Sequence, residues 1–399
     1  MINASAPGWI DKYFLIQKKT PLVKNNDLDA FYLKVRKTGF IYGHIISFET
    51  ETPIDTKGWV QNEIPKVALL NILHATYQLH YPEETPASFI KKALDFYDAM
   101  HPQGFQLFKK VLPNSPDSYN LEKIIDSRVQ TNIDIVSKNF SHIVTNALLF
   151  IDIVAFREFL TKGTLVDKYL KKIEESIVSI ISLALKTKTN KSKYDDLLIK
   201  LFEASVRYSK FSKINIHNID ELNLSYFNAD LEKYYMVDMA GMSLWSDGKL
   251  ENEEAYFLYK LAEKIGVSDD FVTKSIHETN EFISKHKKEI PYFNYSNPVK
   301  HFYDQTTKNV ETLITRNKNR LFKEITESKE LMILLATSTT RDLDEKEKKK
   351  VKKQLLEICK TIPSLTIFLL PGGSLLLPIL IKFIPKMLPS AFNENMDSE

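Results

Sequence analysis

Four basic residues gather on one stretch in the C-terminal part of the chain: Arg316, Lys318, Arg320 and Lys323. Apolar residues at helical spacing share the stretch and predict one amphipathic helix over about 310–325: Val310, Leu313, Ile314, Leu321 and Ile325. Guanidinium and ammonium groups on a helix face can bind phosphate, either of lipid headgroups or of RNA. The alternative is a solvated surface that binds no ligand.

Motifs of enzyme active sites are missing from the sequence. Walker A, Gly-x-Gly-x-x-Gly, His-Glu-x-x-His and Gly-x-Ser-x-Gly do not occur. The nine histidines are scattered, and His74 and His80 are spaced so that they fall on different faces of a helix. His277 precedes Glu278 but has no second histidine at the spacing of a metal site. We therefore expect no enzyme and identify no small-molecule substrate.

The composition is that of a folded protein, with 43% apolar and 26% charged residues in 399. This length predicts two or three domains. A net charge of +3 provides no general attraction to nucleic acid or acidic lipid. Any electrostatic binding of such partners must therefore come from local clusters of charged residues. The single cysteine, Cys359, excludes an internal disulfide and suits a reducing compartment. Asp11 and Lys12 interrupt the first apolar stretch, so we expect no secretory signal and a cytoplasmic bulk.

The chain is predicted to be all-α. It has only 11 glycines, and its apolar residues recur at spacings of three and four, as in residues 124–140 and 148–160. We interpret these stripes as core. Three parts are predicted: a multi-helix N-terminal region over 1–225, a small helical domain over 226–290 and a C-terminal region over 295–399.

The proposed small domain contains an acidic turn between helices. The stretch MVDMAGMSLWSDGKLENEEAYFLYKLAEKIGVSDDFVTKSI reads as helix, acidic turn, helix, turn, helix. We expect Asn252 to cap the second helix, with Glu253 and Glu254 in its first turn, where the helix dipole favours carboxylates. Gly266 suits the end of that helix.

The order Asp-Gly-x-Leu-x-x-Glu-Glu followed by Lys-Ile-Gly-Val-Ser resembles the TerB-like domain of tellurite-resistance and stress proteins. The resemblance implies a site for a divalent cation such as calcium. Its ligands would be Asp247, Glu251 and Glu254, because hard cations need several convergent oxygens. The alternative is that these carboxylates cap a helix and stay solvated. The order of the oxygen-bearing residues does not fit an EF-hand loop.

An apolar stretch broken by prolines and glycines, FLLPGGSLLLPILIKFIPKMLPSAF, occupies residues 368–392. No charged side chain occurs over 361–381, and about 20 helical residues would span the ~30 Å hydrocarbon core. We predict a kinked membrane segment over about 362–384, spanning or re-entrant, with a buried core helix as the alternative. The residues expected to shape this segment are Pro371, Gly372, Gly373, Pro378, Lys382, Pro385, Lys386 and Pro389.

The charges beside this segment predict its orientation. Lysines crowd residues 346–353, whereas the tail NENMDSE is acidic. The positive-inside rule therefore places the bulk of the chain in the cytoplasm of a bacterial cell and the tail beyond the inner membrane. Lys382 and Lys386 could reach the far headgroups, and they count against this orientation.

The stretch KKQLLEICKTIPSLTIFLLPGGSLLLPILIKFIPKMLPSAF looks like the transmembrane motif of the LETM family, the leucine zipper and EF-hand-containing transmembrane proteins. Its most specific part is Pro385, Met387, Leu388, Pro389, Ser390 and Phe392. With the TerB-like unit, the chain is similar to bacterial LETM-related proteins of the biofilm-associated type. The resemblance implies cation/proton exchange, volume homeostasis and ribosome attachment. Since the sequence ends soon after Phe392, we expect the family's following domain, similar to a ribosome-binding fold, to be missing.

We therefore expect a membrane-anchored LETM-related protein in envelope or ion homeostasis, with a role in biofilm formation. Its expected partners are membrane lipid and further copies of the chain. One alternative is a soluble or peripheral module that binds the ribosome, RNA or a divalent metal. Another is an oligomeric cation/proton exchanger, for which Lys382 is the nearest ionisable residue to the uncharged stretch.

Overall fold

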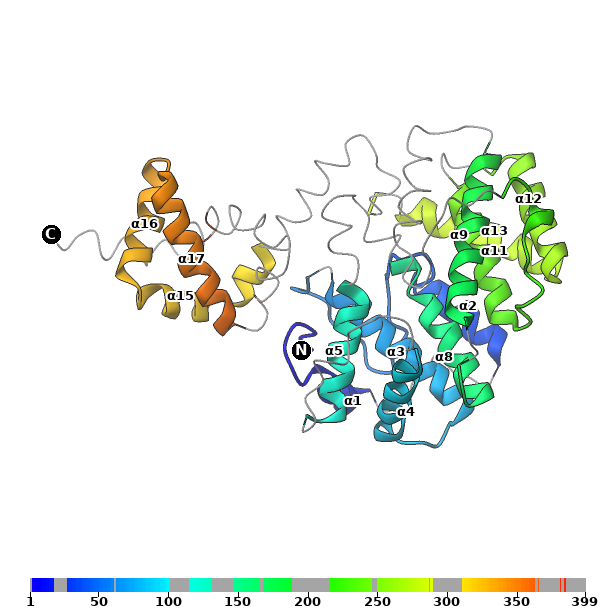
Figure 1. Ribbon diagram of the computed structural model, residues 1–399, viewed down its shortest axis with the longest axis horizontal. Coiled ribbons are helices and arrows are strands. Elements are labelled where there is room, and N and C mark those ends of the chain that lie inside the picture. Colours follow the sequence, from blue (N-terminus) through cyan, green and yellow to red (C-terminus); the bar gives the residue numbers. More distant parts are fainter. Residues whose placement is uncertain are drawn as a thin grey trace. The chain divides into compact units, whose positions relative to one another are not determined.

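The computed structural model is all-helical over the residues that it describes, and no strand occurs among them (Figure 1). These residues are 2–17, 27–60, 62–100, 115–130, 146–165, 168–188, 216–245, 250–286, 288–289, 311–362, 365, 381 and 384. The prediction of an all-α fold is confirmed for this part of the chain.

Contacts divide the chain into two compact units. The large unit comprises residues 10–54 and 65–296, and the C-terminal unit comprises residues 1–9, 55–64 and 297–399. Helices from both sides of residue 225 pack together in the large unit, so the boundary that we expected there falls inside one unit. The C-terminal unit also takes in two short segments from the start of the chain.

The helices before residue 290 vary from one turn to five turns in length. They are α1 (Trp9–Ile16), α2 (Leu28–Lys37), α3 (Glu63–His80), α4 (Pro86–Ala99), α5 (Asp117–Gln130), α8 (Phe150–Lys162), α9 (Tyr169–Thr187), the 3-10 helix η2 (Ile219–Glu221), α11 (Asp230–Leu244), α12 (Asn252–Ile265) and α13 (Asp269–His286).

Helix α11 forms the centre of the large unit. It packs against α9, α12 and α13, and every residue from Tyr235 to Leu244 is buried (Figure 1). A helix that is covered on all sides is expected to be apolar all round. Helix α11 nevertheless carries the carboxylate of Asp238, which has no exposed surface.

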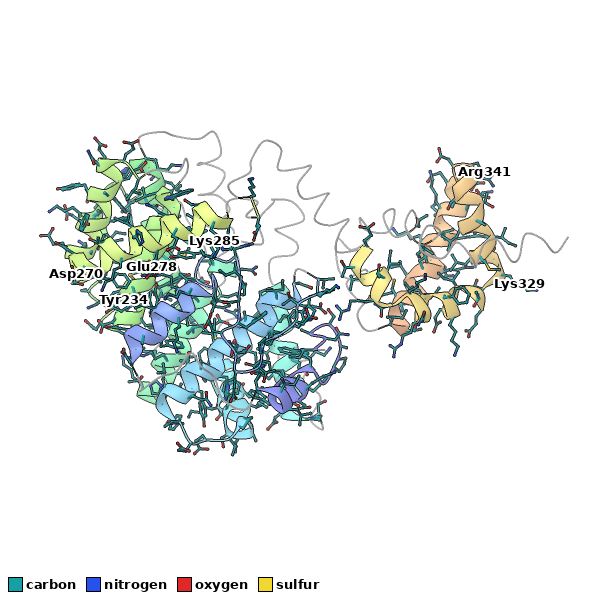
Figure 2. The ribbon with its side chains drawn as sticks, turned by 180° about the vertical axis from the view of Figure 1, so that it is seen from behind. Tyr234, Asp270, Glu278, Lys285, Lys329 and Arg341 are labelled. Atoms are coloured by element: carbon teal, nitrogen blue, oxygen red, sulfur yellow. The ribbon has the colours of Figure 1, made fainter. Side chains whose placement is uncertain are left out.

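Asp238 is compensated by side chains from two other helices. From α2, Arg36 donates through Nε to Oδ2 at 2.8 Å and through Nη2 to Oδ1 at 3.0 Å, and the hydroxyl of Tyr32 donates to Oδ2 at 2.6 Å. From α13, the hydroxyl of Ser275 donates to Oδ1. Arg36 also donates through Nη1 to Glu278, which lies on α13 (Figure 2), at 2.8 Å. The network joins α2, α11 and α13 through one buried charge.

The same network determines the protonation of its members. Burial alone would lower the pKa of Arg36, but Asp238 holds this pKa above its usual value, so the guanidinium stays charged. Burial and then the charge of Asp238 raise the pKa of Tyr32 well above its ordinary value. Tyr32 therefore keeps its proton and remains a donor.

A second buried carboxylate connects α4, α5 and α8. Asp152 of α8 has no exposed surface and accepts a hydrogen bond at 2.7 Å from Nε of Arg128, whose Nη2 pairs with the other oxygen. The hydroxyl of Tyr97 donates to the same Oδ2 at 3.2 Å. Both networks follow the rule that a buried charge needs a partner and full hydrogen bonding.

His74 of α3 is a core residue rather than a ligand. Its ring lies 4.9 Å from that of Phe14 and 5.0 Å from that of Phe89, between centroids, and the residue is buried. Burial lowers the pKa of His74 to about 4, so the imidazole is neutral in the folded protein near pH 7.

The buried imidazole makes stability dependent on pH. In the unfolded chain His74 binds a proton below its ordinary pKa of about 6.5, whereas the folded protein resists protonation down to about 4. Stability must therefore fall as the pH falls through this window, by about 2–3 kcal/mol at the acid end. His74→Phe should lose less stability than the wild type between pH 7 and pH ~4.5 in urea unfolding. Equal losses would contradict this assignment.

Removing the carboxylate of Asp238 should strongly destabilise the large unit. Asp238→Ala leaves the buried charge of Arg36 with only the partly exposed Glu278 as a carboxylate partner, and we expect a loss of about 3–5 kcal/mol in the free energy of unfolding. The matched control is Asp230→Ala, an exposed position in the first turn of the same helix, which should cost about 1 kcal/mol or less. The double variant Arg36→Met with Asp238→Leu should be more stable than Asp238→Ala. If it is not, the charge does not dominate this site.

Candidate functional site

The C-terminal unit contains three helices that pack on one another: α15 (Lys318–Thr326), α16 (Lys329–Thr340) and α17 (Glu345–Thr361) (Figure 1). Lys329 begins α16 and Arg341 follows its end (Figure 2). Apolar residues from all three helices form one core, which includes Leu321, Ile325, Leu331, Leu335, Val351, Leu355 and Ile358. Cys359 belongs to this core, and burial raises the pKa of its thiol to about 12, so the thiol stays protonated.

Helix α17 begins at a capping box. Oδ1 of Asp344 accepts from the backbone N–H groups of Lys346 and Glu347 at 2.8 Å each, and Oε2 of Glu347 accepts from the N–H of Asp344 at 2.9 Å. Nη1 and Nη2 of Arg341 also donate to Glu347, at 2.8 and 2.7 Å. This pairing with Arg341 lowers the pKa of Glu347 to about 2. The start of the helix is therefore held by charged groups at any ordinary pH.

Exposed lysines lie on the side of α17 opposite its buried residues. Val351, Leu355 and Ile358 point into the core, while Lys346, Lys349, Lys352 and Lys353 are exposed. The spacing of Lys346, Lys349 and Lys353 puts them on one face, with Lys352 at its edge. None of the four forms an ion pair with a described carboxylate. We call these four residues the lysine stripe.

A neighbouring lysine has a structural partner instead. Lys350 pairs with Glu330 of α16 at 2.6 Å, and the side-chain amide of Gln354 donates to the other oxygen of Glu330 at 2.8 Å. These contacts tie α17 to α16 and leave the lysine stripe facing solvent. Residues 311–362 carry 13 basic and nine acidic side chains, so this part of the chain is more positive than the remainder.

The prediction of one helix over 310–325 is wrong, because the helical residues 311–316 are separated from α15 by a turn at Asn317. The side-chain amide of Asn317 donates to the carbonyl of Leu313 at 2.7 Å, and such bonding competes with the regular helix.

The four basic residues of this stretch are in two different environments. Nη1 of Arg316 donates at 2.6 Å to Oε2 of Glu63, whose carboxylate is fully buried and also accepts from the N–H of Val60. Arg316 therefore has a structural partner. In contrast, the other three residues are exposed and could meet phosphate: Lys318, Arg320 and Lys323.

The acidic turn is described only in part, since Asp247 lies outside the described residues. Glu251 is the exposed N-cap of α12, one position before Asn252, which we expected to have that role. Oε2 of the buried Glu254 accepts from the N–H of Glu251 at 3.0 Å, so this carboxylate caps the helix. Gly266 ends α12 at φ 70°, as predicted. A cation at Asp247, Glu251 and Glu254 stays a prediction.

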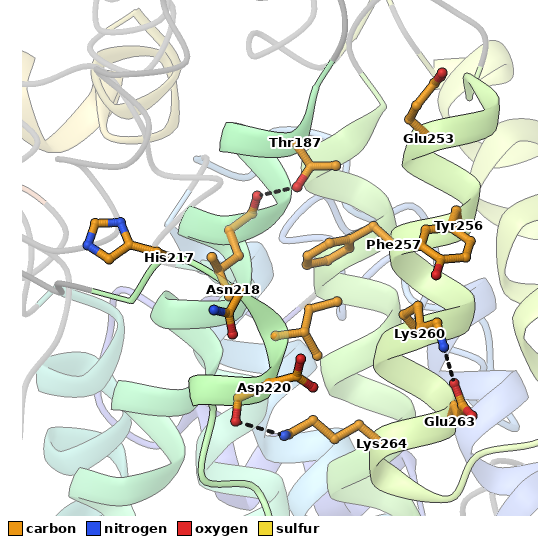
Figure 3. A pocket seen from close by; sticks show the side chains of 12 residues that line it. Thr187, His217, Asn218, Asp220, Glu253, Tyr256, Phe257, Lys260, Glu263 and Lys264 are labelled. Atoms are coloured by element: carbon orange, nitrogen blue, oxygen red, sulfur yellow. Dashed lines mark hydrogen bonds and ion pairs between the residues drawn. The ribbon is translucent and has the colours of Figure 1, made fainter.

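A pocket of about 670 Å³, lined by polar and apolar residues, lies between the end of α9, η2 and α12 (Figure 3). Both lysines of the lining have partners: Nζ of Lys264 donates to the backbone carbonyl of Asp220 at 3.1 Å, and Lys260 pairs with Glu263 at 2.8 Å. Sequence reasoning did not find this pocket because its walls come from three separate segments, and no motif marks them.

The predicted membrane segment is mostly beyond the described residues. This applies to Pro371, Gly372, Gly373, Pro378, Lys382, Pro385, Lys386 and Pro389. Near the two ends of the segment, Ile362, Leu365 and Ile384 are buried in the core of the C-terminal unit, and Ile381 packs against it. Among the helices that the structure describes, none has both the length and the apolar character needed for a bilayer crossing. The described ends of the segment thus contact protein.

The comparisons with known proteins concern this same region. A family model described as "LETM1-like, RBD" matches residues 343–399, which include α17 and its lysine stripe. The match supports the relation to the LETM1 family that the C-terminal motif indicated. In the family a domain similar to a ribosome-binding fold follows this motif, and we expected that domain to be missing. The model described as RBD nevertheless matches residues 343–399, which contain the motif itself. No curated protein and no solved structure matches the chain.

The pairing of Arg316 predicts a stability role for this residue. Arg316→Ala removes the partner of a buried carboxylate, and we expect it to lower the free energy of unfolding of the C-terminal unit by about 3 kcal/mol. Arg320→Ala is the matched control, because this exposed residue should contribute within about 0.5 kcal/mol. Urea unfolding of the two variants measures the difference. Similar stabilities would show that the Arg316 and Glu63 pair contributes little.

Proposed function

We propose that this protein is a LETM1-related protein that acts at an anionic membrane surface in ion or envelope homeostasis, with biofilm formation as the associated process. The lysine stripe of α17 carries this proposal. It lies within the segment that matches the LETM1-like family model, and it precedes the uncharged residues 361–381. Basic side chains beside an apolar stretch are a combination that attaches proteins to membranes.

The packing of α17 supports a binding role for its outer face. Because Val351, Leu355 and Ile358 are buried, the helix cannot rotate without exposing apolar surface. The capping box at Asp344 and the pair between Lys350 and Glu330 restrain it further. Lysines whose ammonium groups have no carboxylate partner are available for phosphate. Each lysine near an anionic bilayer contributes about 1 kcal/mol to attachment.

The proposed location is the inner membrane of a bacterial cell, with the bulk of the chain in the cytoplasm. The negative surface potential of the cytoplasmic leaflet would attract the lysine stripe there. The apolar sequence after α17 would supply the hydrophobic part of the attachment, by spanning, re-entry or shallow insertion. The proposed role is one of binding and anchoring, without catalysis. Ion exchange would require an oligomer and an ionisable group such as Lys382.

A second candidate function uses the same surface. RNA presents the same phosphate chemistry as a lipid headgroup, so the lysine stripe together with Lys318, Arg320 and Lys323 could contact RNA or the ribosome. The exposure of these residues favours this candidate as well. The two functions differ in what they require beyond charge, because only membrane attachment uses the apolar sequence after α17.

Neutralising the lysine stripe should detach the protein from anionic vesicles. The change of Lys346, Lys349, Lys352 and Lys353 to glutamine removes about 4 kcal/mol of electrostatic attraction, which corresponds to a loss of about a thousandfold in partitioning. Flotation of the full chain with vesicles of phosphatidylcholine, with and without phosphatidylserine, measures this loss. Binding should also weaken as salt is added.

The control variant carries four equal changes elsewhere, at the exposed Lys91, Lys123, Lys274 and Lys285 of the large unit. It should float like the wild type. Retained flotation of the stripe variant would overturn the proposal. A different outcome would favour the RNA function over the membrane function. In that case the wild type does not float with vesicles but binds single-stranded RNA, and the stripe variant loses this RNA binding.

A further inference from the structure

Two histidines and one carboxylate converge at one place in the large unit. Nε2 of His44 lies 3.5 Å from Oε2 of Glu289, and Nδ1 of His286 lies 3.2 Å from the same oxygen. One nitrogen or oxygen from each of the three residues lies within 4.8 Å of the others. His44 follows α2 in the sequence, whereas His286 is the last residue of α13. The cluster is therefore a product of the fold and not of a local motif.

These distances fit a shared metal ion. An ion with nitrogen and oxygen ligands at about 2.0–2.1 Å in tetrahedral geometry places neighbouring ligand atoms about 3.3 Å apart. The distances of 3.2 and 3.5 Å from the two histidines to Glu289 lie close to this value. The third pair, between the nitrogens of His44 and His286, lies within 4.8 Å, so binding an ion would require these two rings to approach by at most about 1.5 Å.

The ligand types select the class of metal. Imidazole nitrogens with a carboxylate suit zinc and its neighbours in the first transition row. Calcium and magnesium prefer oxygen ligands alone. Three protein ligands leave one position for water, as in zinc sites that are open to solvent. Glu289 is 61% exposed, so an ion can enter from solvent.

The surrounding residues hold the ligands in place. Phe282 of α13 packs against both imidazoles, with ring centroids 6.3 Å from His44 and 5.1 Å from His286. The backbone N–H of His44 donates to the carbonyl of Gly39 at 3.2 Å, and that of Glu289 donates to the carbonyl of His286 at 2.8 Å. These contacts preorganise the three side chains.

Gly39 makes the close turn at His44 possible. Its φ is +78°, and a Cβ there would lie 2.0 Å from the carbonyl oxygen of His44 and 2.9 Å from the ring of Phe282. No residue with a side chain fits this position without movement of the turn. The turn therefore brings His44 against α13, where it meets the other two ligands.

We propose that His44, His286 and Glu289 bind one divalent transition-metal ion of the zinc class, with water as the fourth ligand. The site is separate from the acidic turn at Asp247, where a calcium-type ion was predicted. It also does not depend on the membrane function of the C-terminal unit. A metal here would tie the loop after α2 to the end of α13.

Metal titration of the full chain tests this proposal. Isothermal titration with Zn²⁺ should give one site per chain, and Co²⁺ should give the visible absorption of a tetrahedral complex. We expect Glu289→Gln and His286→Ala each to weaken Zn²⁺ binding by about 10–100-fold or more. Even the loss of a residue that only hydrogen-bonds to a metal ligand has an effect of this size. The matched controls on α13, Glu281→Gln and His277→Ala, should bind like the wild type.

Glu289→Gln keeps the test decisive if a histidine variant fails to fold, because Glu289 is largely exposed and its replacement has the same shape. Circular dichroism without metal should match that of the wild type. The proposal is overturned if Zn²⁺ binds Glu289→Gln as tightly as the wild type, or if no saturable site is found. Equal competition by Ca²⁺ would overturn the assignment to the zinc class.

Discussion

The large unit depends on one buried charge, the carboxylate of Asp238 in the middle of α11. An isolated charge in such a place would cost far more than a folded protein can tolerate, so the fold must bring a cation and several donors to it. Arg36 and Tyr32 of α2 and Ser275 of α13 meet this requirement. Because α2 lies about two hundred positions before α11 and α13, satisfying one carboxylate also joins distant parts of the chain.

The same constraint recurs at two other places. Arg128 compensates Asp152 among α4, α5 and α8, and Arg316 compensates the buried Glu63 within the C-terminal unit. In each case arginine, which stays charged and presents several donors in one plane, reaches a carboxylate from a different segment. Apolar packing supplies most of the stabilisation, but it is not directional. These ion pairs therefore contribute to the choice of one arrangement of the helices.

Basic residues of the same type have different roles in the C-terminal unit. Lys350 connects α17 to α16, whereas the lysines of the stripe face solvent. Arg316 supports the fold, although Lys318 and Arg320 beside it are exposed. Charge content alone could not separate these roles, because a lysine or arginine becomes structural only when a carboxylate from another segment lies within reach. The apolar residues Ile362, Leu365 and Ile384 likewise belong to a protein core at places where hydropathy indicated lipid.

The sequence by itself determined the features that depend on residues close together in the chain. Helical periodicity indicated the all-α fold, Gly266 predicted the end of a helix, and the C-terminal motif indicated the LETM1 relation. Only the tertiary structure decided which polar groups meet. The pairing of Arg36 with Asp238 and the convergence of His44 with His286 join residues more than two hundred positions apart. Such contacts follow from the path of the whole chain, and no local pattern of residue types specifies that path.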